Sequence, residues 1–239
     1  MKLFANGVIE STRVNLPIII TALITTAASL VIFSLSTYDS NVTKLLQLSP
    51  VTPWGVFTGI FVHSDEMHIL SNLTMLWMWT LYIIGPVSFL TREERIKRAK
   101  FFVPAIVSSA IIVNLAWMII FSEVNPGVEF TSRGASGLVY AFSGAALGFA
   151  AMNMVHALPR FKSQPSERRT VIRVMFSNII VVILIFGLAM FDTDLFLSKA
   201  PGSNVFAHGL GFMFGLGLVM AREYIVSMKG PSSPPVSTH

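Results

Sequence analysis

Cysteine is absent from this chain of 239 residues, and charged residues make up only 12% of it, against 53% hydrophobic residues. Without cysteine there can be no disulfide, no thiolate nucleophile and no cysteine-bound metal. Any covalent catalysis must therefore use an oxygen or nitrogen nucleophile. The shortage of charge excludes an ordinary soluble domain and indicates a protein of the lipid bilayer.

Acidic residues are also scarce, because 12 aspartates and glutamates face 17 lysines and arginines, for a formal charge of +5. In a soluble protein this excess could indicate nucleic-acid binding. Here the basic residues stand in short runs between apolar segments, which is typical of membrane proteins. We therefore expect the bilayer as a partner and no nucleic acid.

Six stretches contain no charged residue and are long enough to cross the hydrocarbon core, which takes about 20 helical residues. They are too long and too uniformly apolar for barrel strands, and unpaired backbone groups are not tolerated in lipid, so each is predicted to be a helix. The predicted fold is all-α, a polytopic six-helix bundle with spans at residues 14–38, 67–90, 101–121, 134–159, 174–191 and 200–221.

The segments between and beside these spans are expected to form loops and terminal segments. A seventh charge-free stretch, residues 45–64, is interrupted by prolines and glycines and is predicted to be an interfacial or re-entrant loop. The first apolar run lacks a following cleavage site and is expected to be a retained span. The predicted six-helix domain, residues 14–225, lies between a cytoplasmic segment, residues 1–13, and a disordered cytoplasmic tail, residues 226–239.

The basic residues also predict the orientation. Only Lys44, Arg133 and Lys199 fall on the side of the six spans opposite the N-terminus, and the other 14 fall on its own side. Positive charge accumulates on the cytoplasmic side, so both termini are expected there. The lack of extra domains favours a prokaryotic plasma membrane.

Three predicted spans start on the outer side, and each carries polar residues near that end. The second span has His68 and Asn72 one helical turn apart, on one face. The fourth carries Ser136 two residues after Gly134, and the sixth carries His208. At about 1.5 Å per helical residue, these side chains lie at a similar shallow depth.

Glycines four residues apart predict that the fourth and sixth spans pack closely, at Gly144 and Gly148 and at Gly211 and Gly215. Such packing could bring Ser136 within reach of His208, and a serine becomes a useful nucleophile only when a base takes its proton. The resulting oxyanion could be stabilised by the Ser136 N–H and the side chains of Asn72 and His68.

Each of these residues also has an ordinary structural interpretation. A serine in an apolar helix usually bonds a carbonyl of its own helix, and a membrane histidine often forms a structural pair. The Gly-x-Ser-Gly motif is short and lacks the full nucleophile elbow. Because serine, histidine and a His-x-x-x-Asn pair occur at one depth on three helices of the same direction, we favour the catalytic interpretation.

These motifs resemble the rhomboid family of intramembrane serine proteases over nearly the whole membrane region. The family's His-x-x-x-x-His-x-x-x-Asn motif is present at His63, His68 and Asn72. Its Gly-x-Ser-Gly motif begins at Gly134, and its Ala-His-x-x-Gly-x-x-x-Gly motif begins at Ala207.

The resemblance implies a serine endopeptidase that cleaves transmembrane protein substrates and needs no cofactor and no metal; it predicts no oligomeric state. Tyr140 would pack against His208, and His63 would be structural. The implied catalytic dyad is Ser136 and His208. The implied oxyanion hole consists of His68, Asn72 and the Ser136 N–H. The implied supporting residues are His63, Gly134 and Tyr140.

The sequence departs from the family pattern in two places. Trp54-Gly55 stands where many rhomboids have Trp-Arg, and Phe89 stands where an acid commonly follows Gly85. Both departures concern loop anchoring and bundle rigidity. In related rhomboids the fifth helix and the loop after it are proposed to move and admit substrate, which here are residues 174–191 and 192–203.

Two other functions remain open at this point. A non-catalytic membrane protein could use the same scaffold to recognise helices without cleaving them. A small transporter is less favoured, because no carboxylate lies within any predicted span to couple ions or protons.

Overall fold

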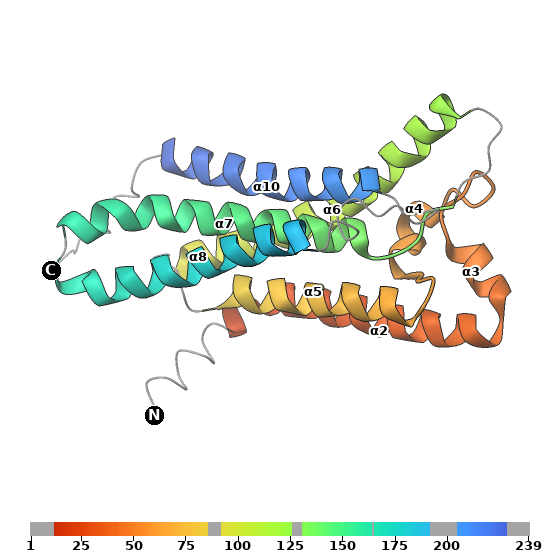
Figure 1. The fold of residues 1–239 in the computed structure, drawn as a ribbon, viewed down its shortest axis with the longest axis horizontal. Helices are drawn as coiled ribbons and strands as arrows, with labels where there is room; N and C mark the ends of the chain where they lie inside the picture. Colours follow the sequence, from red (N-terminus) through yellow and green to blue (C-terminus); the bar gives the residue numbers. More distant parts are fainter. Residues whose placement is uncertain (1–11, 86–91, 126–130, 164, 192–204, 229–239) are drawn as a thin grey trace, which may run out of the picture.

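A computed structural model of the chain describes residues 12–85, 92–125, 131–163, 165–191 and 205–228. Its long helices lie side by side in one bundle (Figure 1). In chain order the elements are α2 (Leu16–Tyr38), α3 (Ser40–Leu46), α4 (Gly55–Thr58), the 3-10 turn η1 (Gly59–Phe61), α5 (Glu66–Ile84), α6 (Arg92–Val124), α7 (Ser136–Ser163), the 3-10 turn η2 (Pro165–Glu167), α8 (Arg168–Phe191) and α10 (Val205–Met228).

Six of these helices are long and apolar enough to cross a membrane, namely α2, α5, α6, α7, α8 and α10. This confirms the six predicted spans, although some helices are longer than the apolar runs. The α6 helix begins at Arg92 rather than at residue 101, because charged residues can continue a helix beyond the hydrocarbon. Glu93 and Lys97, one turn apart, form an ion pair of 2.7 Å in this extension. Most of the predicted N-terminal segment and tail lies outside the described residues.

One end of the bundle, here called the loop end, holds α3, α4 and the first turns of α5, α7 and α10 (Figure 1). The predicted loop at residues 45–64 is confirmed as a non-spanning region of short helical turns. It is tied to the segment before α7, because Leu48 and Ser132 exchange two backbone hydrogen bonds of 2.9 Å.

Gly55 allows part of this loop to pack on itself. A Cβ at this position would overlap the backbone of Gln47 and Leu48, so no larger residue fits without moving the chain. The neighbouring Trp54 donates its indole N–H to the Leu45 carbonyl at 2.8 Å. Close backbone approach therefore anchors the loop at the position where the resemblance predicts an arginine side chain. Phe89, the other departure, lies outside the described residues.

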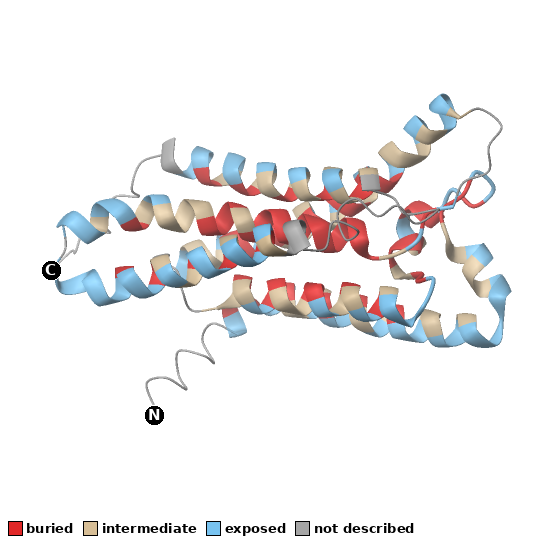
Figure 2. Cartoon of the chain, in the orientation of Figure 1, coloured by how far each residue is buried: buried red, intermediate tan, exposed pale blue. Residues whose placement is uncertain are grey.

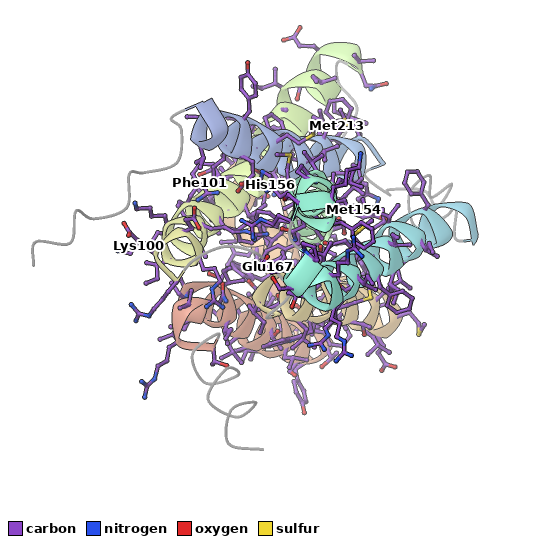
Figure 3. The ribbon with its side chains drawn as sticks, turned by 90° about the vertical axis from the view of Figure 1, so that its left-hand side faces the viewer. Lys100, Phe101, Met154, His156, Glu167 and Met213 are labelled. Atoms are coloured by element: carbon purple, nitrogen blue, oxygen red, sulfur yellow. The ribbon has the colours of Figure 1, made fainter. Side chains whose placement is uncertain are left out.

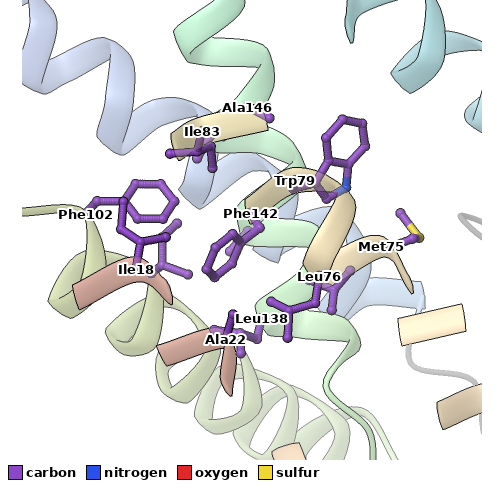
Figure 4. Packing of buried hydrophobic residues seen from close by; sticks show 14 of the residues in the cluster. Ile18, Ala22, Met75, Leu76, Trp79, Ile83, Phe102, Leu138, Phe142 and Ala146 are labelled. Atoms are coloured by element: carbon purple, nitrogen blue, oxygen red, sulfur yellow. The ribbon is translucent and has the colours of Figure 1, made fainter. Parts of the chain in front are cut away.

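The α7 helix occupies the centre of the bundle, as the buried residues in Figure 2 show. In its most apolar stretch 67% of residues are buried, against 22% in α2 and α10. Around it the largest buried side chains meet, including Trp79 of α5 and Phe102 of α6 (Figure 4). The Phe102 ring meets the Phe142 ring of α7 edge to face, with centroids 5.2 Å apart.

The closest approach of two helices is made by glycines of α7 and α10. A Cβ on Gly215 would overlap the Ala141 carbonyl, and one on Gly144 would overlap the Phe212 carbonyl. At Gly148 a Cβ would lie 3.0 Å from the Val219 side chain. The predicted close packing of the fourth and sixth spans is therefore present, and it depends on the missing side chains.

Two charged residues are buried at the opposite end of the bundle, and this corrects the expectation that no carboxylate lies within a span. Glu223 and Arg98 are 6% and 9% exposed. Glu223 pairs with Arg222, and the Arg98 guanidinium lies 3.3 Å from the centroid of the Phe149 ring. The expectation was wrong because the sixth span was ended at residue 221, whereas α10 continues beyond it.

A buried polar network joins α5, α7 and α8 towards the same end, onto which Figure 3 looks. Asn178 of α8 is fully buried and accepts hydrogen bonds from the Tyr82 hydroxyl at 2.5 Å and from the Asn153 side chain at 3.3 Å. Its own amide donates to the Val174 carbonyl. The first half of α8 is therefore held to α5 and α7 by specific hydrogen bonds as well as by apolar packing.

Candidate active site

Ser136 is the first residue of α7 and is 9% exposed. The N–H groups in the first turn of a helix have no acceptor within the helix, and the helix dipole adds partial positive charge there. The chain just before the serine is held in place, because the Gly134 N–H donates to the Gly59 carbonyl at 2.9 Å. Ser136 thus lies at a fixed helix end that suits developing negative charge.

Gly134 makes the turn into α7 possible. Its φ of 113° lies in the left-handed region that favours glycine. A Cβ here would lie 2.6 Å from Nε2 of His68 and 3.7 Å from Nδ2 of Asn72. The segment that carries the serine therefore lies directly against both predicted oxyanion-hole side chains. The helix starts at Ser136 rather than at residue 134, because this backbone is not helical.

His208 reaches the same end of the bundle from α10. Its ring stacks on the Tyr140 ring, with centroids 4.3 Å apart and 16° between the planes. Ser136 and Tyr140 are four residues apart in α7 and so share one face of the helix. A Cβ on Gly211 would lie 2.5 Å from the Gly137 carbonyl, which shows how closely the two backbones approach beside this face. The imidazole therefore lies over the face of α7 that carries Ser136.

Asn72 is buried in α5, and its Nδ2 has no acceptor among the described residues. A buried donor without a partner costs about 1–3 kcal/mol, so such a group is uncommon in a folded protein. An oxyanion formed beside Gly134 would supply the missing acceptor.

His68 lies one turn before Asn72, and its other ring nitrogen has partners of its own. Nδ1 is 2.9 Å from the Ser64 hydroxyl, which donates to the Asp65 carboxylate at 2.7 Å. Asp65 also caps α5, because its carboxylate accepts the His68 backbone N–H at 2.8 Å. The Ser64 hydroxyl and these backbone bonds lower the pKa of the Asp65 carboxyl.

His63 is 3% exposed and meets the His68 ring edge to face, with centroids 5.1 Å apart. Its Nδ1 lies 3.2 Å from the Phe61 carbonyl. Burial, and then repulsion by His68, lowers the pKa of His63 to about 4. His63 is thus neutral at pH 7 and packs behind His68.

The structure brings together residues from each of the predicted motifs, but sequence reasoning missed Ser64 and Asp65. An acidic residue directly before a helix is a common cap, so Asp65 could have been found by its position. The contact of Ser64 with His68 depends on the turn before α5 and leaves no signal in the sequence. No group of three or more histidine or carboxylate side chains placed to bind a metal occurs in the part of the chain that is described.

Comparison with known families gives one match. The family model described as Rhomboid domain matches residues 50–223, which is more than half of the chain. The matched range begins within the first loop and ends in α10, so it includes every residue of the candidate site. No curated protein matches the chain.

Proposed function

Because the chain belongs to the rhomboid family of intramembrane proteases, we propose that it is a serine endopeptidase that cleaves peptide bonds in or near transmembrane segments. The observation that carries the proposal is the meeting of three elements at the loop end. The first turn of α7 brings Ser136, α10 brings a histidine stacked over the same face, and α5 brings a buried amide without an acceptor.

In the proposed reaction the Ser136 hydroxyl attacks the substrate carbonyl and His208 takes its proton. The stacked Tyr140 ring fixes the plane of the imidazole and so its direction towards α7. Negative charge on the carbonyl oxygen is stabilised by the Ser136 N–H, Asn72 and His68. His208 then gives its proton to the leaving amine, and water releases the acyl group from Ser136.

Two other functions are less well supported. A transporter is no longer disfavoured by a lack of buried carboxylates, since Glu223 is buried, but the family match favours proteolysis. A helix-binding protein without activity would need neither an activated serine nor an oxyanion hole. The reactivity of the Ser136 hydroxyl therefore distinguishes a protease from a protein that only binds helices.

Labelling of the purified protein with a fluorescent fluorophosphonate tests the proposal, because only an activated serine reacts. We expect one labelled site, lost in Ser136→Ala and in His208→Ala, and cleavage of a single-span reporter reduced by at least about three orders of magnitude in both. The matched control is Ser143→Ala, because the Ser143 hydroxyl donates to its own helix at Val139 and should not react. Full activity in either dyad variant would show that the assignment is wrong.

A further inference from the structure

The Ser64 hydroxyl lies between a carboxylate and an imidazole at the start of α5. Its oxygen is 2.7 Å from the Asp65 carboxylate and 2.9 Å from Nδ1 of His68. Both contacts have the length of good hydrogen bonds, yet a serine hydroxyl has only one hydrogen to donate. The direction of the two bonds therefore decides which nitrogen of His68 carries a proton.

The Asp65 carboxylate settles this direction. It is ionised at neutral pH and can only accept, so the Ser64 hydroxyl must donate to it. The hydroxyl oxygen then accepts a hydrogen bond, and the donor at 2.9 Å is Nδ1–H of His68. The Ser64 backbone N–H also faces Nδ1, but from 3.5 Å, which is beyond an ordinary N–H hydrogen bond.

A proton held on Nδ1 has a consequence for the opposite side of the ring. Nε2 is the atom that faces Gly134, where a Cβ would lie 2.6 Å from it. In a neutral imidazole with Nδ1–H, Nε2 carries a lone pair, which would repel an oxyanion instead of stabilising it. His68 can therefore serve the oxyanion only after Nε2 has also been protonated.

We infer that Ser64 and Asp65 are positioning residues that allow His68 to take a second proton as the oxyanion forms, so that Nε2 becomes a positively charged donor. This inference rests on the proposed protease function. In the acylation step the Ser136 oxygen bonds to the carbonyl carbon, the carbonyl π electrons move to oxygen, and the serine proton passes to His208. The second proton on His68 comes from solvent water and returns there when the carbonyl re-forms.

The charged and titratable groups around His68 give the sign of the pH dependence. Burial of the ring is the largest influence and opposes the second proton, as do Arg133 and, when protonated, His63, whereas the Asp65 charge favours it. Rising pH removes the second proton, so kcat should fall on the alkaline side. Without the Asp65 charge this fall should occur at lower pH.

The substitution Asp65→Asn separates charge from helix capping, because asparagine caps a helix about as well as aspartate. We expect kcat to fall about tenfold near neutral pH with KM unchanged, and the alkaline limb to move down by about one pH unit. Ser64→Ala should act in the same way, and Ser64→Thr, which retains the hydroxyl, should restore the wild-type profile. Glu66→Gln is the matched control, since it removes the next carboxylate and should change nothing. A wild-type profile in Asp65→Asn would overturn the inference.

Nitrogen-15 NMR of protein labelled at its histidines measures directly which ring nitrogens carry a proton. The variant His68→Gln lacks the His68 signal and so assigns it. In the free protein the His68 proton should reside on Nδ1, and in the phosphonate adduct of Ser136 both nitrogens should carry protons. A free protein with its proton on Nε2, or a neutral His68 in the adduct, would overturn the inference. If the wild-type protein failed to react with the phosphonate, the proposed function would fail, while the spectrum of the free protein would still decide where the Nδ1 proton lies.

Discussion

Nδ2 of Asn72 and Nε2 of His63, at the loop end, are among the buried polar atoms that have no partner within the described residues. Leaving such groups unpaired lowers the stability of the fold, and an active site is one place where that cost is offset by function. The two groups differ in what surrounds them. Asn72 faces the Gly134 turn, where an oxyanion would form, whereas His63 lies behind His68.

Replacement of Asn72 by alanine should therefore separate activity from stability. We expect kcat to fall by about two to three orders of magnitude with little change in KM, because an oxyanion donor acts mainly in the transition state. The melting temperature in detergent should stay the same or rise, because an unpaired buried amide is removed.

The matched comparison for this variant is Asn114→Ala. The Asn114 amide donates to the Val56 carbonyl at 3.1 Å, so its loss should lower the melting temperature. An effect of Asn72→Ala on KM alone would assign Asn72 to substrate binding, and a parallel loss of stability would assign it a structural role.

His63 should make the stability of the protein depend on pH. Its pKa is about 4 in the folded protein, against an ordinary 6.5, so the unfolded chain binds the additional proton between these values. The free energy of unfolding should be highest above about pH 6.5 and should decrease by at most about 3 kcal/mol as the pH falls towards 4. Below that pH the effect of His63 should level off.

Thermal unfolding in detergent between pH 7.5 and 4 measures this effect. The variant His63→Gln should have a flatter profile over that range, because glutamine does not titrate. The Asp65 carboxyl, whose pKa is lowered, acts only at the acidic end, since its contribution is lost as the pH falls below its ordinary pKa of 3.8. An unchanged profile in His63→Gln would contradict the assignment.

At the scale of single elements, α8 shows one buried stripe and one exposed face. Val174, Asn178, Val181 and Ile185 are 5% exposed or less and recur with helical spacing. Phe186 is 58% exposed and so faces the surrounding lipid. The α8 helix therefore packs on the bundle through the bulky side chains of its buried stripe, and Phe186 takes no part in this packing. The loop at residues 192–203 and the Phe191 side chain lie outside the described residues.

If α8 moves to admit substrate, Ile185→Ala should speed the cleavage of transmembrane substrates. The substitution removes about 2–5 kcal/mol of packing at a fully packed site, and a difference of about 1 kcal/mol between the closed and open positions would favour the open position about fivefold. Phe186→Ala, which removes a larger apolar group from the exposed face, should leave the rate unchanged and serves as the control. Cleavage of a short soluble peptide should respond to neither change.

A disulfide between α5 and α8 gives the opposite test of this movement. The chain contains no cysteine of its own, so an introduced pair forms one defined cross-link. The cross-link should slow cleavage and reduction should restore it. Unchanged turnover with α8 locked to α5 would rule out movement of this helix.

At the scale of the whole molecule, the basic residues are distributed unevenly between the two ends of the bundle. The candidate site, the short helices α3 and α4 and two of the three outlying basic residues, Lys44 and Arg133, belong to the loop end. The opposite end carries the basic last turn of α7 and the charged start of α6, with Lys100 labelled in Figure 3. The structure thus gathers the positive charge at the end remote from Ser136, the distribution from which the orientation is predicted.

We expect this orientation to place the loop end outside the cell. A cysteine at Thr131, an exposed position beside the candidate site, should react with an impermeant reagent in intact cells. A cysteine at Lys162, exposed at the opposite end, should react only after permeabilisation. A reporter fused after His239 should read as cytoplasmic, and the reverse labelling pattern would mean that the site faces inward.

The sequence by itself determined the six spans, because a charge in the hydrocarbon is costly and the charge-free runs are long. It also singled out Ser136, His208, His68 and Asn72, because their motifs occur at the same depth on helices of the same direction. Helix ends were less well predicted, since charged residues such as those at the start of α6 can continue a helix beyond the lipid.

Only the tertiary structure decided which faces of these helices meet. Lipid and protein interior are equally apolar, so an apolar helix carries little sign of its inward face, and Ile185 could not be told from Phe186. From the sequence, Gly55 only lacks a side chain that could anchor the loop, whereas in the folded chain the backbone of Leu48 lies directly against it. The contact of Ser64 with His68 arises from a turn whose geometry no residue pattern records, and for that reason the proton on His68 could be placed only from the folded chain.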